Sequence, residues 1–186
     1  MAWLKSKTVV GQKEVALIKL ANEHGSVTVI PSMGGRVWSC VDAKGREMMK
    51  IFGDDTKGYD PLHDGYEEYS SAQYQSAGWS EVYDVTEQDA SHVTMKASLG
   101  NGKTLTRRIG LLPDRAGFKV TSELVGKGQQ VLRIHPAFAT DSLKSTSLVI
   151  FHGGKPEDVK LSETESTNHY LRDGDRPDGK WAFVNR

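Results

Sequence analysis

The amino-acid sequence predicts an all-β protein over residues 1–186, built as one large antiparallel sandwich or barrel. Three observations lead to this fold class. Many short runs alternate apolar and polar residues, which is the pattern of half-buried antiparallel strands. Turn-forming residues interrupt these runs at short intervals. No stretch of helix length carries an apolar stripe with a 3.6-residue period. No linker, repeat or shift in composition divides the chain, so we expect a single domain.

The predicted strands follow one another along most of the chain. In "HVTMKASL" (92–99), Val93, Met95 and Ala97 alternate with polar residues, and the run 117–124 shows the same alternation. By this argument we also expect strands at 14–20, 26–31, 36–41, 103–112, 130–138, 145–151 and 180–184. Turns are expected at 42–47, 99–104, 112–117 and 125–129, where glycine can supply a positive φ.

Residues 54–79 interrupt this pattern of strands. The segment is polar and too irregular for a strand, and loops of this length in a compact domain are often lids or binding loops. Its aromatic side chains suit stacking on the apolar face of a pyranose ring, with His63 and Glu67 beside them for the hydroxyl groups. They equally suit packing over a sheet edge, and both interpretations stay open. The aromatic residues are Tyr59, Tyr66, Tyr69, Tyr74 and Trp79.

The run "RIHPAF" at 133–138 places two ionisable residues in what otherwise has the pattern of a core strand. Side chains of a strand alternate between its faces, so Arg133 and His135 are expected to project from one side. Leu132 and Ile134 are expected to project from the other. A polar strand face of this kind is either open to water or lines a site, and the residues alone do not decide between the two.

Composition limits the classes of function. The chain has 24 Lys and Arg residues against 24 Asp and Glu residues, well interleaved, which does not fit a nucleic-acid-binding protein. The single cysteine, Cys40, excludes an internal disulfide framework, and its alternating context predicts a buried structural thiol. The N-terminus lacks the apolar run of a signal peptide, and no run approaches the ~20 residues that span a bilayer. We expect a soluble, cytoplasmic protein with no membrane partner.

No motif points to a cofactor or a metal ion. The six histidines are scattered, with no pair at the spacing of a zinc site. The "GGK" run after His152 lacks the spacing of a phosphate-binding loop, and "DGDRPDG" lacks the downstream glutamate of a calcium loop. We therefore predict neither a cofactor nor a metal site.

Several runs, taken in order, resemble the galactose mutarotase-like superfamily. "GSVTVIPSMGGRVWSCVDAKGREMM" (25–49) is similar to the opening of these domains, with a strand, a Gly-Gly-Arg turn and a second strand. "GWSEVYDV" (78–85) resembles the tryptophan-containing stretch after the first long loop. The run 105–141 resembles the central meander, which ends in a histidine-bearing strand, and "DGKWAFVN" (178–185) is similar to a later Gly-x-Trp strand.

This resemblance implies a large antiparallel sandwich that binds carbohydrate on its concave face, with aldose 1-epimerase activity. In such enzymes a histidine protonates the ring oxygen of the sugar as general acid, and a glutamate takes the proton of the anomeric hydroxyl. The family histidine matches His135, and an imidazole suits proton exchange near neutral pH. Arg133 is expected to hold a hydroxyl or a carboxylate from the same face. Further sugar-binding candidates are Trp79, His63 and Arg36, of which Arg36 also suits a structural role in its turn.

The resemblance does not supply a general base. In these epimerases the glutamate lies on a late strand beyond the Gly-x-Trp stretch, and the sequence stops directly after that stretch, so the C-terminal third of the domain is expected to be missing. The alternative function is a non-catalytic sugar-binding or structural β-domain of a larger carbohydrate-active protein. Missing strands would leave open sheet edges, and we expect such an edge to pair in a homodimer.

Overall fold

The computed structural model describes the backbone of residues 4–10, 13–49, 65–70, 77–139, 146–152, 155–160 and 181–185. It describes the side chains of residues 14–49, 65–70 and 77–139. The chain divides into two compact units, Met1–Ala139 and Thr140–Arg186. The single domain expected over residues 1–186 stays a prediction.

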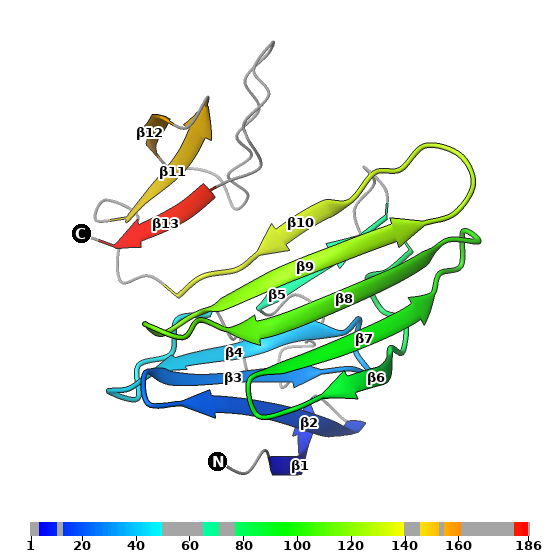
Figure 1. The fold of residues 1–186 in the computed structure, drawn as a ribbon, viewed down its shortest axis with the longest axis horizontal. Coiled ribbons are helices and arrows are strands. Elements are labelled where there is room, and N and C mark those ends of the chain that lie inside the picture. Colours follow the sequence, from blue (N-terminus) through cyan, green and yellow to red (C-terminus); the bar gives the residue numbers. More distant parts are fainter. Residues whose placement is uncertain are drawn as a thin grey trace. The chain divides into compact units, whose positions relative to one another are not determined.

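The first unit contains two sheets that stack face to face as two layers (Figure 1). The six-stranded sheet has the order β1-β2-β3-β4-β5-β10, with β1 Leu4–Val10, β2 Lys13–Asn22, β3 Gly25–Ile30, β4 Arg36–Asp42, β5 Tyr66–Tyr69 and β10 Arg133–Pro136. The four-stranded sheet has the order β6-β7-β8-β9, with β6 Asp84–Gln88, β7 His92–Ser98, β8 Thr104–Leu111 and β9 Phe118–Val125. Each pair of neighbouring strands in these sheets is antiparallel.

The second unit contains a three-stranded antiparallel sheet in the order β12-β11-β13. Its strands are β11 Thr146–His152, β12 Lys155–Lys160 and β13 Trp181–Asn185. Two of them, β11 and β13, confirm the strands expected at 145–151 and 180–184. No strand was expected at the position of β12.

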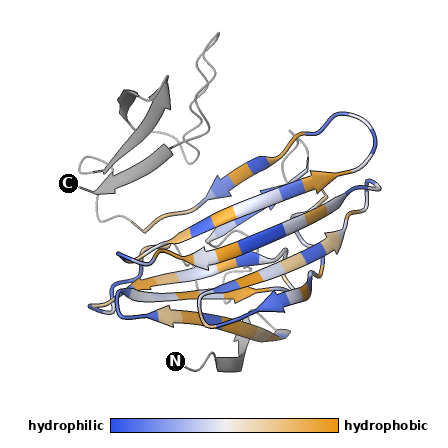
Figure 2. Ribbon diagram, viewed as in Figure 1, coloured by the Kyte–Doolittle hydropathy of each residue, from blue (hydrophilic) through white to orange (hydrophobic). Residues whose placement is uncertain are grey.

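The hydrophobic core of the first unit lies between its two sheets. It is formed by Ile18, Leu20, Val27, Val29, Val37 and Cys40 from β2 to β4, and by Val93, Met95, Ala97, Leu105 and Ile109 from β7 and β8. Figure 2 shows the corresponding alternation of hydrophobic and hydrophilic bands along β7, β8 and β9. Burial, followed by the nearby Glu47 and Asp42 carboxylates, raises the pKa of the Cys40 thiol to about 12. The buried structural thiol is thus confirmed.

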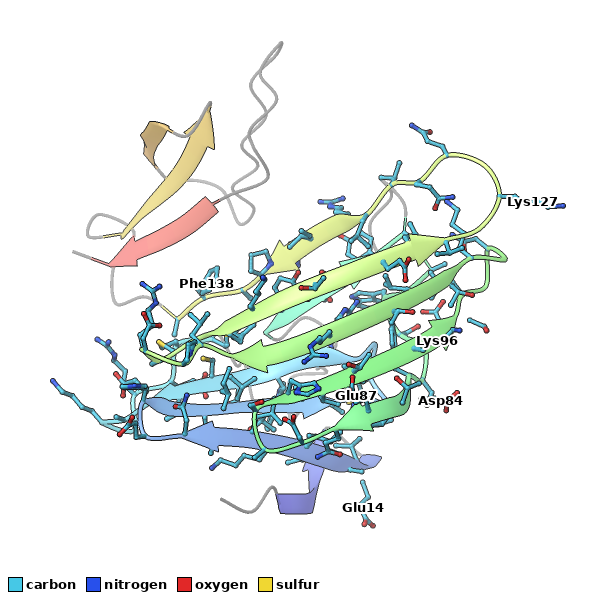
Figure 3. The ribbon with its side chains drawn as sticks, viewed as in Figure 1. Glu14, Asp84, Glu87, Lys96, Lys127 and Phe138 are labelled. Carbon is cyan, nitrogen blue, oxygen red and sulfur yellow. The ribbon has the colours of Figure 1, made fainter. Side chains whose placement is uncertain are left out.

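The described part of the chain confirms the all-β antiparallel fold class, and its β-sheet layers are consistent with the expected sandwich. Strands expected from the alternating pattern appear as β2, β3, β4, β7, β8, β9 and β10. No strand was expected for β1 or β6. Strand β6 lies at the edge of its sheet, and four of its five residues are exposed. Its sequence therefore does not alternate between apolar and polar residues. Figure 3 shows Asp84, Glu87 and Lys96 on the outer face of this sheet.

The expectation of an irregular segment is wrong at residues 66–69, where the structure has strand β5. This strand pairs with β10 along its whole length and meets β4 at the pair Val37 and Tyr66. All four of its residues are buried. A strand covered on both faces does not need to alternate in polarity, because its polar side chains can be satisfied by buried partners. Residues 54–64 and 71–76 lie outside the described residues.

The Gly-Gly-Arg turn between β3 and β4 has a backbone that favours glycine. Gly34 and Gly35 have φ values of 72° and 57°. A Cβ atom on Gly34 would lie 2.1 Å from the carbonyl oxygen of Trp79, and one on Gly35 would lie 2.9 Å from the Tyr83 ring. The turn therefore holds the segment around Trp79 against the start of β4, where Arg36 enters the sheet.

Within the residues that the structure describes, no helix has the length and hydrophobicity required for a membrane span.

Candidate functional site

Strand β5 carries two neighbouring glutamates that are both buried, Glu67 with 1% and Glu68 with 2% of its surface exposed. Because side chains alternate along a strand, the two carboxylates point to opposite faces of the sheet. A buried carboxylate is costly unless it is paired with a cation and hydrogen-bonded. Each glutamate has such partners, and the two sets of partners are separate.

The Glu67 carboxylate receives its cation from the Gly-Gly-Arg turn. Its Oε2 atom accepts a hydrogen bond from Trp79 Nε1 at 2.5 Å and pairs with the Arg36 guanidinium at 3.2 Å. Arg36 is fully buried, and its Nε donates to the Met33 carbonyl oxygen at 2.8 Å. The guanidinium also reaches the Trp79 carbonyl oxygen at 3.5 Å. Arg36 therefore ties the turn, Trp79 and Glu67 together, which is the structural role considered for it from the sequence.

The other oxygen of Glu67 contacts His135. Glu67 and His135 are directly opposite each other in the β5–β10 register, and Oε1 lies 2.7 Å from His135 Nδ1. The His135 side chain is 33% exposed, so it is only partly packed. Two residues along, Arg133 is opposite Tyr69, and its guanidinium carbon lies 5.5 Å from the centre of the Tyr69 ring. Arg133 and His135 thus share one face, as their spacing predicted.

The Glu68 carboxylate lies on the opposite face of β5, toward the four-stranded sheet. Its Oε2 atom accepts from Arg107 Nε at 2.7 Å and from the Ser122 hydroxyl at 2.6 Å, while Tyr66 donates its hydroxyl to Oε1. Burial lowers the pKa of Arg107, but Glu68 and two tyrosines outweigh it and leave the pKa above its ordinary value. Burial and Glu68 likewise raise the pKa of the Tyr66 phenol, so this hydroxyl stays protonated and remains a donor.

Arg107 also fastens the Gly-Gly-Arg turn from the second sheet. One terminal nitrogen donates to the carbonyl oxygens of Gly34 at 2.8 Å and Gly35 at 2.7 Å. Its guanidinium carbon lies 5.0 Å from the centre of the Tyr83 ring. Two buried arginines on different strands therefore hold the two glutamates of β5, and both also bind the backbone of the turn or its neighbours.

The structure brings four of the five sequence-derived site residues to one region around Glu67. Arg36, Trp79 and His135 contact the Glu67 carboxylate directly, and Arg133 lies beside His135 on the same strand. The fifth, His63, lies outside the described residues. Sequence reasoning noted Glu67 only as a neighbour of the aromatic residues. It did not single out Glu68 or Arg107 at all.

The geometry of this region defines what its groups can do. Glu67 is nearly inaccessible, and its carboxylate contacts the side chains of Trp79, Arg36 and His135. Trp79 is 9% exposed, and the Tyr69 ring is buried beneath Arg133. Among the described side chains of this face, His135 is partly exposed and Arg133 is half-buried. Arg133 and His135 thus place two polar side chains on one face, next to the buried Tyr69 ring.

A second histidine–carboxylate cluster lies at the start of β7. His92 Nδ1 is 2.8 Å from Asp89, and its Nε2 is 3.5 Å from Glu87. Hydrogen bonds from the Ser91 backbone above all, with smaller contributions from the Ser91 hydroxyl and His92, lower the pKa of Asp89 to about 2. The three residues of this cluster all belong to the β6–β7 hairpin, so their contacts stabilise that turn. Among the described side chains, no group of three or more His, Cys, Asp or Glu residues is placed to hold a metal ion.

No protein-family model matches the chain, and the search of curated proteins found no match.

Proposed function

We propose that this chain binds carbohydrate on the face of β5 and β10 that carries Arg133 and His135, and that it interconverts sugar anomers as aldose 1-epimerases do. The observation that carries the proposal is the contact between the partly exposed His135 ring and the buried Glu67 carboxylate at 2.7 Å. An imidazole that is fixed on one side and accessible on the other is the usual arrangement of a histidine that exchanges protons with a ligand.

The surroundings of His135 fit a sugar. The Arg133 guanidinium can donate two hydrogen bonds to hydroxyl oxygens or to the carboxylate of a sugar acid. Its position over the Tyr69 ring limits the directions in which the guanidinium can point. Trp79 lies on the other side of Glu67, and its indole N–H is used within the protein. The proposed location of this activity is the cytoplasm, on the sequence argument alone.

The proposed reaction opens and recloses the sugar ring. His135 donates a proton to the ring oxygen as the bond from C1 to that oxygen breaks, and a base takes the proton of the C1 hydroxyl, which gives the open-chain aldehyde. Rotation about the C1–C2 bond presents the other face of the carbonyl. The hydroxyl then adds to C1 and returns its proton to His135, and the base returns the proton to the C1 oxygen. No base is assigned among the described residues.

The rival function is carbohydrate binding without catalysis. It is favoured by one observation: Glu67, the carboxylate in contact with His135, is 1% exposed and is held by Arg36 and Trp79. Glu67 cannot reach a sugar hydroxyl in this position and is not the missing base. In the rival case the same face binds sugar, and the two anomers interconvert at their uncatalysed rate.

Replacing His135 by asparagine separates the two functions. For the enzyme, we expect the full chain to accelerate the optical rotation change of freshly dissolved α-glucose or α-galactose, and His135→Asn to lower that acceleration by about 10²–10⁴-fold, because general acid catalysis is lost. The matched control is His92→Asn, which removes another carboxylate-paired histidine from the same unit. It should leave the acceleration unchanged. Polarimetry at constant pH measures the rate of the rotation change with each of the three proteins.

Two results would count against catalysis. A wild-type protein that binds sugar without accelerating the rotation change would leave the rival function in place. Equal acceleration by wild type and His135→Asn would remove His135 as the acid.

A further inference from the structure

We propose, on the basis of the function proposed above, that Glu67 is the positioning residue of His135. Its carboxylate fixes the ring proton on Nδ1 and so assigns proton exchange with the sugar to Nε2. Glu67 then belongs to the site without touching the substrate.

Glu67 itself has little freedom to move. Oε2 is held by the Trp79 indole and by Arg36, and Arg36 is held in turn by the carbonyl oxygens of Met33 and Trp79. Oε2 thus accepts from one N–H donor and pairs with one cation, which are the partners of a carboxylate. An ionised carboxylate only accepts hydrogen bonds. The direction in which Oε1 points is therefore set by groups other than His135.

The His135 imidazole contacts Glu67 through one ring nitrogen. Nδ1 lies 2.7 Å from Oε1, and the two residues are paired across the β5–β10 ladder, so backbone register and side-chain contact agree. Because Oε1 can only accept, Nδ1 must donate, and the neutral ring then carries its proton on Nδ1. When the ring gains a second proton it does so at Nε2, because Nδ1 already carries one. A carboxylate behind a catalytic histidine acts in this way in other enzymes.

Glu68 provides a matched control on the same strand. It is as buried as Glu67, pairs with an equally buried arginine and accepts hydrogen bonds from two hydroxyl groups. It differs in facing the four-stranded sheet instead of His135. Glutamine at position 68 therefore reproduces the loss of one buried negative charge from β5, with no change in the group that faces His135.

The test records the ring nitrogen signals of His135 by nuclear magnetic resonance in the full chain, at a pH where the ring is neutral. Wild type and Glu68→Gln should carry the proton on Nδ1. In Glu67→Gln the amide oxygen is needed by Arg36 and Trp79, so the amide N–H₂ group faces His135 and donates to Nδ1. The proton should then move to Nε2. A purely structural role of Glu67 would not change the tautomer.

Kinetics provide the second readout. We expect Glu67→Gln to lower kcat for anomer interconversion by roughly 100-fold or more, since an amide in place of the carboxylate lowers kcat by up to about 10⁴-fold in the serine-protease triad. KM should stay within about twofold, because Glu67 does not reach the sugar, and Glu68→Gln should keep both constants near wild type. An unchanged tautomer or an unchanged kcat in folded Glu67→Gln would overturn the inference.

Wild type alone is also informative if the variant does not fold. A neutral His135 ring that carries its proton on Nε2 in wild type overturns the role of Glu67 without any substitution. Failure of the proposed function looks different, since the wild-type tautomer would be as expected but no sugar would bind and no anomers would interconvert.

Discussion

Replacing Arg107 by methionine is expected to lower the free energy of unfolding by about 3–5 kcal/mol, because it leaves the buried Glu68 carboxylate without its cation. The arginine is fully buried, and its Nε lies 2.7 Å from Glu68. The same substitution removes the donors to the carbonyl oxygens of Gly34 and Gly35, which would then be buried without those partners. Urea unfolding followed by tryptophan fluorescence measures the change.

The neighbouring arginine is the control for this substitution. Arg108 has the same residue type on the same strand but points to the outer face, where its side chain is 51% exposed and lies 3.3 Å from Glu87. Exposed ion pairs contribute roughly 0–1 kcal/mol, so Arg108→Met should change stability by less than about 1 kcal/mol. Equal losses for the two variants would show that Arg107 does not hold the two layers together.

Replacing Gly34 by alanine is expected to cost about 2–5 kcal/mol. One part of the cost comes from the left-handed backbone at φ 72°. This conformation destabilises a residue with a Cβ atom by about 1–2 kcal/mol. The other part is steric, because the new Cβ would lie 2.1 Å from the Trp79 carbonyl oxygen. That oxygen belongs to the backbone and cannot rotate away, and overpacking of this kind costs about 1–3 kcal/mol. The shift of Trp79 should also weaken the hydrogen bond of its indole to Glu67.

Gly45→Ala separates strain from steric conflict. Gly45 has a similar φ of 82°, but a Cβ atom there would meet nothing within 4 Å. It should therefore lose only the backbone part, about 1–2 kcal/mol. Both variants are measured by thermal and urea unfolding. If they lose the same free energy of unfolding, the steric conflict with the Trp79 carbonyl oxygen does not contribute to the cost of Gly34→Ala.

The alternation of apolar and polar residues was sufficient to predict the strands that have one buried face. In β7, the buried Val93, Met95 and Ala97 are separated by more exposed residues, so the two-residue period is visible in the sequence. Strand β6 escapes this reasoning because most of its residues are exposed. Alternation reports a difference between the two faces of a strand, and a strand without that difference gives no signal.

Strand β5 escapes prediction for the opposite reason. Its sequence, Tyr-Glu-Glu-Tyr, has the composition of a surface loop, yet all four residues are buried. What makes burial possible is a pair of arginines that lie 31 and 39 residues away from their glutamates along the chain. Pairings at such separations depend on the order of strands in the sheets, which local periodicity does not report.

In the candidate site, too, some features followed from the sequence and others did not. The shared face of Arg133 and His135 followed from strand geometry alone, and the register with β5 agrees with it. That His135 contacts a buried carboxylate could not be predicted, because residues 66–69 were expected to be a loop. The available signal for Glu67 was a pair of glutamates between two tyrosines, followed by Trp79 and by the distant strand with His135.

Titration of the full chain with glucose, galactose and their sugar acids, followed by amide and side-chain signals in nuclear magnetic resonance, tests the proposed sugar face most directly. We expect saturable shifts at Arg133, His135 and the Trp79 indole, with no shift at Lys96 on the outer face of the four-stranded sheet (Figure 3). The largest response should come from sugar acids if Arg133 holds a carboxylate. A folded sample with no saturable shift at these residues in tens of millimolar sugar, or with shifts centred on Lys96 instead, would contradict the proposed site.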